Sequence, residues 1–207
     1  MNRALALVAL LCAACGARQQ PTPESFFDDL PPPELLSPHA AEPDFVLRQH
    51  VTARWATGET EFDAVVQKHE GALRIVALSP TGQPGFVITL DADLEVHVEN
   101  RTDRALPFRP ERILADVQKV FFPWVEGVPD EDGVRRGEAF GLEVIERWPE
   151  GRITERTFLS ADGSVESRVR YERWDARRIA PRRAILTHET LGYELTVETL
   201  EELLLID

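Results

Sequence analysis

The sequence is poor in sulfur-containing residues: of 207 residues, two are cysteines and one is methionine. Both cysteines, Cys12 and Cys15, lie at the N-terminus, so the rest of the chain has neither a disulfide framework nor a cysteine-bound metal. The five histidines, at 39, 50, 69, 97 and 188, do not have the spacing of metal ligands. We therefore expect no metal site, and we expect His97 and His188 to be solvated or hydrogen-bonded side chains within strands.

Motifs of catalysis and cofactor binding are also missing. The glycine-containing runs are turns, which lack the lysine of a phosphate-binding loop and the strand-to-helix context of a dinucleotide site. Ser79, in Leu-Ser-Pro-Thr-Gly, does not stand in a nucleophile elbow. Carboxylates are many, but the sequence marks no pair as tuned for acid–base chemistry. We expect a protein that is not an enzyme and that has no cofactor.

Positive charge is scarce. The chain has 23 Lys and Arg against 36 Asp and Glu, a formal net charge of -13, which repels phosphate backbones and argues against nucleic acid as a partner. Arginines do gather at positions 173, 177, 178, 182 and 183. We interpret this cluster as a solvated turn.

Long apolar runs are confined to the first 15 residues. Met-Asn-Arg gives a positive start, and the apolar stretch that follows is too short to span a membrane, as in a secretory signal peptide. The end of this stretch, Leu11-Cys12-Ala13-Ala14-Cys15, resembles the lipobox of bacterial lipoproteins. The resemblance implies a signal peptide over residues 1–14 and acylation of Cys15, with palmitate among the acyl chains.

Two alternatives to lipidation are a plain cleaved signal that leaves a free Cys15 and a disulfide between Cys12 and Cys15. In the lipoprotein interpretation, the acyl chains anchor the protein to a membrane. Gly16, in place of Asp, resembles the outer-membrane sorting signal of lipoproteins of enteric type. We thus expect a protein anchored in the cell outer membrane and facing the periplasm.

Residues 15–43 are rich in proline and acidic groups and have no strand or helix period, which predicts a lipidated tether. Two parts of this tether, residues 26–27 and 30–36, are apolar enough to dock on the domain that follows. Docking is one interpretation of these residues, and a proline-rich ligand for a partner is the other.

Residues 44–207 read as one domain that is mostly β. In residues 45–55, apolar and polar residues alternate with the period of a half-buried strand. Four further strands up to residue 98 are expected to complete an antiparallel meander. A second meander begins at residue 140, with strands expected at 140–148, 153–159, 165–174, 183–190 and 193–200, and a last strand at 203–206 is expected to close the sheet. Residues 126–137 are expected to form an acidic loop.

Residues 109–124 are the one long segment with a helical period. Ile113, Leu114, Val117, Val120 and Phe121 form one stripe that must be buried. Pro110 suits the first turn, Glu111 favours the positive end of the helix dipole, and Pro123 ends the helix at about residue 122. The helix is expected to serve as a plug or a lid.

About ten to eleven strands with short links and one helix predict a strongly curved antiparallel sheet, or half-open barrel, with the helix over its concave face. A two-sheet sandwich is the alternative.

Residues 51–55, 78–86, 98–101 and 107–118 resemble a family of bacterial lipoproteins with a domain of unknown function, which is similar to the lipoprotein carriers LolA and LolB. The resemblance implies a half-open barrel of about eleven strands, roofed by helices, with an apolar cavity for acyl chains. It also raises a periplasmic carrier protein as a partner. The membrane-bound receptor LolB exposes an apolar residue in an early loop, whereas the comparable loop here carries Thr81, which argues against delivery of lipoproteins into the membrane.

We therefore predict a membrane-anchored lipoprotein that binds acyl chains or another apolar ligand and takes part in lipid or lipoprotein trafficking at the outer membrane. The predicted cavity residues are Trp55, Phe86, Ile88, Val96, Val117, Val120, Phe121 and Phe140. The alternative is a structural or interaction lipoprotein of the envelope whose core is solidly packed. An enzyme ranks third.

Overall fold

A computed structural model of the chain describes residues 31–41, 43–102, 106, 108–122, 125, 128–173 and 180–205. In this part, eleven strands form one antiparallel sheet beside one α-helix, α1 (Pro110–Phe121), and two 3-10 turns, η1 (Pro38–Ala40) and η2 (Pro149–Gly151). The strands are β1 (Asp44–Trp55), β2 (Gly58–His69), β3 (Ala72–Leu78), β4 (Pro84–Leu90), β5 (Val96–Asn100), β6 (Val134–Ala139), β7 (Leu142–Arg147), β8 (Glu155–Leu159), β9 (Val165–Glu172), β10 (Arg183–His188) and β11 (Tyr193–Leu205).

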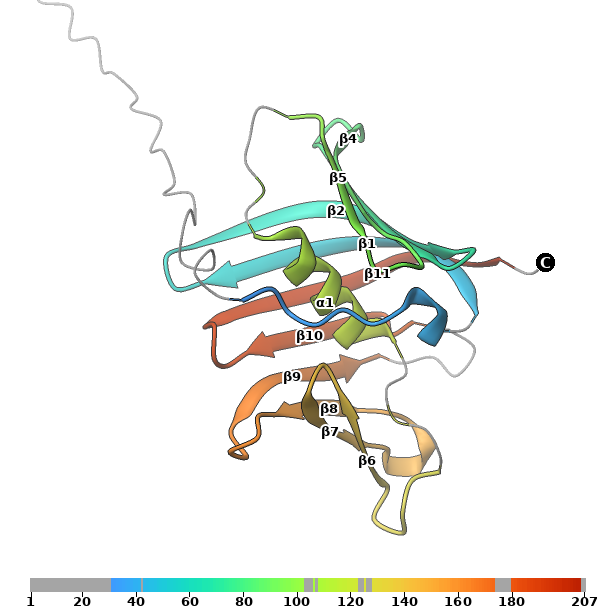
Figure 1. Ribbon diagram of the computed structural model, residues 1–207, viewed down its shortest axis with the longest axis vertical. Coiled ribbons are helices and arrows are strands. Elements are labelled where there is room, and N and C mark those ends of the chain that lie inside the picture. Colours follow the sequence, from blue (N-terminus) through green and yellow to red (C-terminus); the bar gives the residue numbers. More distant parts are fainter. Residues whose placement is uncertain are drawn as a thin grey trace, which may run out of the picture.

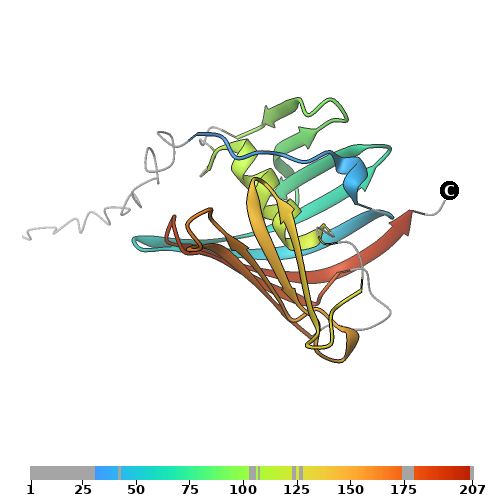
Figure 2. The ribbon, with the colours of Figure 1, turned by 60° about the horizontal axis from the view of Figure 1, so that its bottom comes forward.

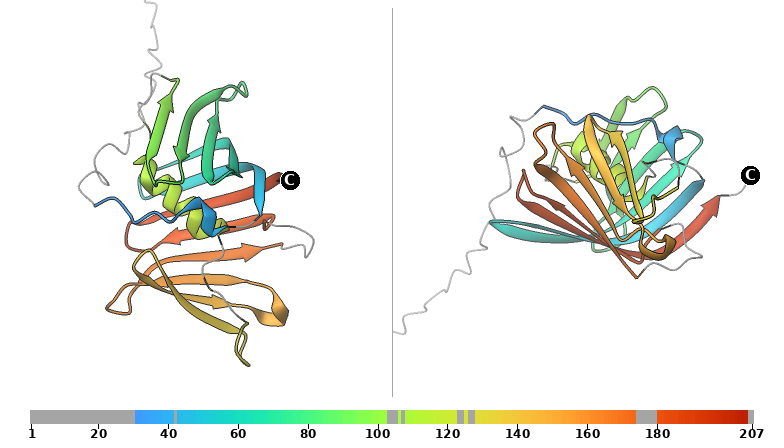
Figure 3. Two further views of the ribbon diagram at one scale, coloured as in Figure 1. Left: turned by 45° about the vertical axis from the view of Figure 1, so that its right-hand side comes forward. Right: turned by 90° about the horizontal axis from the view of Figure 1, so that it is seen from below.

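The sheet consists of two meanders joined by the first and last strands. Its order is β5-β4-β3-β2-β1-β11-β10-β9-β8-β7-β6, so β1 pairs with β11 along almost its whole length. The sheet curves around α1, and its end strands β5 and β6 do not pair with each other (Figures 1, 2 and 3). The predicted single curved sheet with the helix on its concave side is confirmed, and the two-sheet sandwich is wrong.

Two strand predictions need correction. β6 begins at Val134, inside the expected acidic loop, because this edge strand is too rich in charge to show a clear alternation. A separate closing strand at residues 203–206 is also wrong, since β11 continues unbroken to Leu205; residue 206 lies outside the described part.

The alternation of β1 determines which of its faces meets the helix. Phe45, Leu47, Gln49, Val51 and Ala53 are all buried, whereas Arg48 and Arg54 are exposed on the convex face. A bulge between Arg48 and Gln49 shifts the register with β11, so that Gln49 stands opposite Thr199. The concave face of the sheet is therefore apolar apart from a few buried polar side chains.

Helix α1 has the predicted bounds. Pro110 occupies the first turn, and Phe122 at the C-terminal cap is extended, as expected of a residue that precedes proline. None of the helices in the described part has the length and apolar composition needed to cross a membrane.

The burial of α1 differs from the prediction. Leu114 and Val120 of the apolar stripe are buried, but so are Arg112, Gln118 and Lys119 of the polar side. Residues 31–41 cross α1 on the side away from the sheet (Figures 1 and 2), and Gln118 contacts them there. Lys119 is buried instead by the sheet residues Glu166, Ser167 and Phe158. We call residues 31–41 the strap.

The strap is fastened to the helix by one side chain. Gln118 accepts a hydrogen bond from the backbone N–H of Leu36 at 3.1 Å and donates one to the carbonyl oxygen of Leu36 at 2.6 Å. Leu35 and Leu36 pack against two different core clusters, and Ala41 is itself part of the core. The described part of the predicted docking segment, residues 31–36, therefore does lie on the domain.

The described strands, helix and strap surround a complete hydrophobic core. It has three clusters, one toward β1–β4, one toward β6–β11 and a small one around Val51, Ala64 and Val197, and Phe121 packs against all three. Residues 31–205 thus meet the requirement for independent folding, a core of their own.

Candidate functional site: an apolar cavity beside the helix

A cavity of about 70 Å³ lies between α1 and the concave face of the sheet. Of its 16 lining residues, 14 are apolar. The sheet contributes side chains from β1–β4 and β11, namely Val51, Ala53, Phe62, Ala64, Val66, Ile75, Phe86, Leu195 and Val197. Phe108 and the helix residues Ile113, Val117, Val120 and Phe121 supply the remaining apolar wall.

The helix stripe is incompletely packed where it borders this cavity. Ile113, Val117 and Phe121 are only partly buried, although the sequence pattern required the whole stripe to be buried. They face the cavity instead of being tightly enclosed. Four of the eight predicted cavity residues, Phe86, Val117, Val120 and Phe121, are brought together here.

The other four predicted residues lie elsewhere. Ile88 is fully buried in the core, and Val96 packs against the same core cluster. Phe140 packs on Phe158 in the second cluster, with ring centroids 5.9 Å apart. Trp55 contacts Phe108 edge-on at 6.3 Å and borders a separate open groove at the β10–β11 turn. Whether any of the eight contacts a ligand stays a prediction.

Two polar side chains, Gln49 and Asp116, line the cavity. Gln49 is 2% exposed, and its amide nitrogen has no hydrogen-bond partner within the described residues. Asp116 accepts a hydrogen bond from the Tyr193 hydroxyl at 2.7 Å. Burial raises the pKa of Asp116, and the charges of Lys119 and His188 oppose that shift only in part. Burial and the nearby Asp116 also raise the pKa of Tyr193.

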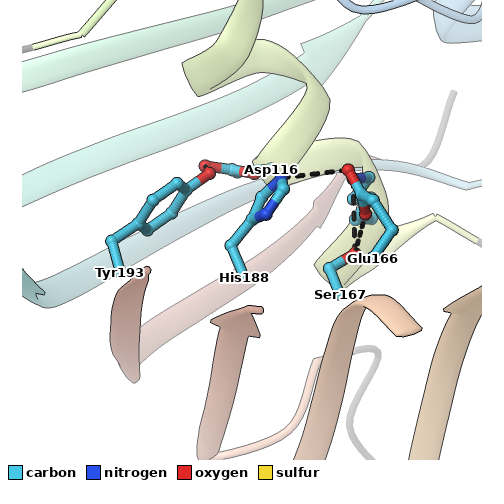
Figure 4. Close-up of polar contacts among 6 residues, drawn as sticks. Asp116, Glu166, Ser167, His188 and Tyr193 are labelled. Atoms are coloured by element: carbon cyan, nitrogen blue, oxygen red, sulfur yellow. Dashed lines mark hydrogen bonds and ion pairs between the residues drawn. The ribbon is translucent and has the colours of Figure 1, made fainter. Parts of the chain in front are cut away.

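Behind Asp116, a buried polar cluster connects the helix with β9, β10 and β11 (Figure 4). Lys119 Nζ lies 2.8 Å and 3.0 Å from the two carboxylate oxygens of Glu166 and 3.3 Å from the hydroxyl of Ser167. His188 Nε2 lies 2.9 Å from Glu166, and the His188 ring packs on Tyr193 at 5.0 Å. We call Asp116, Lys119, Glu166, Ser167, His188 and Tyr193 the clamp.

The clamp determines the charge state of Glu166. Burial by itself would raise the pKa of this carboxyl, but the hydrogen bond from His188 and the charges of Lys119 and His188 outweigh burial and lower the pKa to about 2. Glu166 is therefore a carboxylate at neutral pH, and its charge is matched by the buried Lys119. The ammonium of Lys119 also lies 5.2 Å from the ring centre of Phe158, a cation–π distance.

Further bonds hold the C-terminal turn of the helix against the same side of the sheet. Arg156 donates to the carbonyl oxygen of Lys119 at 2.7 Å and forms a buried ion pair with Glu146 at 2.7 Å. The Tyr171 hydroxyl donates to the carbonyl oxygen of Val120 at 2.9 Å. Burial raises the pKa of Tyr171 to about 12, so its hydroxyl remains a donor.

The distance of 3.3 Å between Lys119 Nζ and the Ser167 hydroxyl would suit a catalytic base and its nucleophile, but the surroundings of the two residues do not. Ser167 is 0% exposed, Lys119 is bound to the carboxylate of Glu166, and neither side chain lines the cavity. A buried serine that no substrate reaches is suited to support and not to attack. The clamp therefore serves to position α1.

Metal-binding groups meet at one place in the described part of the chain, the β4–β5 turn, where Asp91, Glu95 and His97 lie within 4.8 Å of one another. Asp91 accepts backbone hydrogen bonds from residues 93 and 95, so its carboxylate forms part of the turn itself. Glu95 and His97 are exposed, and this arrangement accounts for the group without an ion. The predicted lipidation site, Cys15, lies outside the described residues, as do residues 26–27 and two of the five clustered arginines, Arg177 and Arg178.

Sequence reasoning missed the clamp and both polar cavity residues, although two signals were present. Gln49 is the one polar residue in the alternating buried set 45, 47, 49, 51 and 53 of β1. Asp116 stands three residues after Ile113 and four before Val120, inside the apolar stripe of α1. For the contacts among Lys119, Glu166 and His188 of the clamp there was no such signal, because these residues are far apart in the sequence.

The sequence profile of one protein family, described as a protein of unknown function (DUF3261), matches residues 46–201, well over half of the chain. This match confirms the predicted family of unknown function. No curated protein matches the chain.

Several solved structures are similar to the chain. A LolA superfamily protein from Nitrosomonas europaea is 12% identical, with a TM-score of 0.46, over 82% of this chain and 90% of that one. A domain from Vibrio parahaemolyticus described as an outer membrane lipoprotein-sorting protein is 12% identical, with a TM-score of 0.49, over 80% and 88%. A DUF1329 family protein from Desulfovibrio piger is 12% identical, with a TM-score of 0.44, over 78% and 85%.

Proposed function

This chain belongs to the DUF3261 family of proteins of unknown function, and we propose that it holds an acyl chain, or another apolar ligand, between α1 and the concave face of its sheet. The observation that carries the proposal is the cavity beside α1, in which a helix stripe that could have packed tightly is left partly buried. A cavity with an apolar lining and a few polar groups is the usual form of a site for a small apolar ligand.

The volume of the cavity defines how such a ligand would enter. Ligand sites commonly measure about 300–1,000 Å³, whereas this cavity measures about 70 Å³, room for a few water molecules. An acyl chain therefore requires α1 and the strap to move away from β1–β4. The described conformation represents the closed, unliganded form in this proposal.

A solidly structural role is the second candidate. Its support is the same small volume, together with the clamp, which fixes α1 as firmly as a permanent core element would be fixed. In that case the cavity is a packing defect and the protein is an interaction lipoprotein of the envelope.

Binding and stability measurements on residues 31–207 separate the two candidates. Native mass spectrometry detects co-purified lipid, and titration with the apolar dye N-phenyl-1-naphthylamine measures binding directly. We expect the wild type to bind the dye. If no lipid and no dye binds, the structural candidate stands.

Val117→Glu tests the site itself. If the helix face can open toward water, the charge abolishes dye binding and costs about 1–2 kcal/mol of unfolding free energy. In a permanently closed core, a buried unpaired charge costs about 3–5 kcal/mol. Val65→Glu is the matched control, because Val65 is a half-buried residue of β2 that does not line the cavity.

The proposed location is the periplasmic face of the outer membrane, through acyl chains on Cys15. The support is the lipobox-like sequence at residues 11–15 and the Gly16 that follows. There the protein would take part in lipid or lipoprotein trafficking, with a periplasmic carrier as its partner. Incorporation of labelled palmitate into the wild type and its loss in Cys15→Ser test the anchor; label retained in the mutant contradicts it.

A further inference from the structure

The amide of Gln49 is the most anomalous polar group in the cavity wall. Its nitrogen is buried and has no partner within the described residues, and its neighbours on the same face of β1 are apolar. A buried donor without an acceptor lowers the free energy of unfolding, whereas a leucine of similar size at this position would not. A side chain that destabilises the unliganded protein in this way is expected where a ligand supplies the missing hydrogen-bond acceptor.

A second orphan group stands beside it. Thr199 of β11 is the cross-strand partner of Gln49 at the bulge in the β1–β11 pair, and its buried hydroxyl also lacks a partner in the described part of the chain. Directly opposed residues of an antiparallel pair lie on the same face with Cβ atoms about 5 Å apart. The concave face thus has two adjacent side-chain groups without a hydrogen-bond partner among the described residues, of which Gln49 lines the cavity and Thr199 does not.

Building on the proposed function, we infer that Gln49 recognises the carbonyl oxygen of a bound acyl chain, with its amide nitrogen as the donor. The alkyl part of the ligand would lie against Val51, Val66 and Val197, which surround Gln49 on β1, β2 and β11.

The site favours an uncharged carbonyl, as in an ester or amide, over the carboxylate of a free fatty acid. One neutral donor does not replace the water shell of a carboxylate, and desolvation of an uncompensated charge is costly. Asp116 lines the same cavity, and burial already raises the pKa of this carboxyl. A carboxylate ligand would add a second carboxyl group where the charged form of the first is disfavoured.

Competition against the dye on residues 31–207 tests this inference. N-phenyl-1-naphthylamine has no carbonyl, methyl laurate has an ester carbonyl, and laurate has a carboxylate on the same alkyl chain. The test variant is Gln49→Leu. The control is Gln67→Leu on β2, a half-buried glutamine that does not line the cavity.

We expect Gln49→Leu to lower the affinity for methyl laurate about tenfold, which is the effect of one buried hydrogen bond. The affinity for the dye should stay unchanged. The wild type should bind methyl laurate more tightly than laurate. Removal of the orphan amide should also raise the melting temperature of the unliganded protein by about 2–4 °C. Gln67→Leu should change none of these quantities.

Each other outcome overturns a defined claim. If the wild type does not bind the dye, the proposed function fails. If the dye binds but Gln49→Leu changes methyl laurate binding less than twofold, the function stands and the role of Gln49 is wrong, as expected if a water molecule bridges Gln49 and Thr199. If the mutation weakens dye and ester equally, Gln49 acts through packing. If laurate binds more tightly than the ester, the preference for an uncharged carbonyl is wrong.

Discussion

The two flanks of α1 are built in different ways. On the side of β8–β11, polar side chains of the sheet reach the helix, among them Arg156, Tyr171, Glu166 and Tyr193. On the side of β1–β4, the helix packs through Leu114 in the core and faces a cavity whose wall on these strands is apolar except for Gln49. All hydrogen bonds between helix and strands found among the described residues lie on the first flank.

This difference indicates where the molecule can open. Hydrogen bonds and buried ion pairs are directional, and breaking one leaves a buried group unpaired at a large cost. Apolar contacts are not directional, so a ligand of similar polarity can replace them. In the proposed function, the helix would rotate away from β1–β4 while its clamp stays intact, because hydrogen bonds fix only the other flank, and the strap would have to yield.

The largest effect is expected from breaking the clamp. Lys119→Met removes the matching positive charge and leaves the carboxylate of Glu166 with His188 and the Ser167 hydroxyl as partners. It should lower the unfolding free energy by about 3–5 kcal/mol, measured by urea denaturation. Arg136→Met is the control, because Arg136 and Glu143 form an exposed pair at 3.0 Å whose loss should cost less than about 1 kcal/mol. Equal effects for the two variants would show that the clamp does not fix the helix.

A somewhat smaller loss of stability is expected when the pH is lowered and Glu166 is protonated. The pKa of Glu166 is about 2 in the folded protein and 4.5 ordinarily, so the folded state stabilises its charged form. That stability, about 3 kcal/mol, is fully present above pH 4.5 and is lost as the pH falls through 2.

The difference in unfolding free energy between the wild type and Glu166→Gln should therefore be largest near pH 7 and should vanish toward pH 2. Denaturation curves across this range measure it, and Glu143→Gln, on the exposed pair, should give a small and nearly constant difference. A difference that does not change between pH 7 and pH 2 would contradict the charge assigned to Glu166.

The smallest effect is expected at the strap. Gln118→Leu removes both hydrogen bonds to Leu36 and should cost about 1–2 kcal/mol. Because a looser strap increases the population of the open form, dye affinity should rise severalfold. A fall in affinity would show that the strap forms part of the binding wall and does not close it.

Much of the fold was readable in the sequence because it depends on local patterns. The alternation in β1 gave its buried face, and the spacing of Ile113, Val117 and Val120 between Pro110 and Pro123 gave the helix and its bounds. β6 was missed because Arg135, Arg136 and Glu138 obscure its alternation. An edge strand tolerates such charge, so the pattern that marks a half-buried strand is weak there.

The cavity could be predicted only in part from the sequence, because apolar patterns do not show which buried side chains border an empty space. Phe86, Val117, Val120 and Phe121 were predicted as cavity residues and do line it, but Ile88, a residue of the same type and period, is packed in the core. Apolar character predicts that a side chain is buried away from solvent. It does not show whether other atoms fill the space beside that side chain.

By itself, the sequence determined the mostly β class, the position of helix α1, the face that β1 buries and the family, because each of these depends on the type and spacing of neighbouring residues. The clamp, the bonds that hold the strap and the size of the cavity were decided by the tertiary structure alone. Lys119 meets Glu166 across 47 residues and Gln118 meets Leu36 across 82, and only the curvature of the sheet around α1 brings such groups into contact and leaves space beside them.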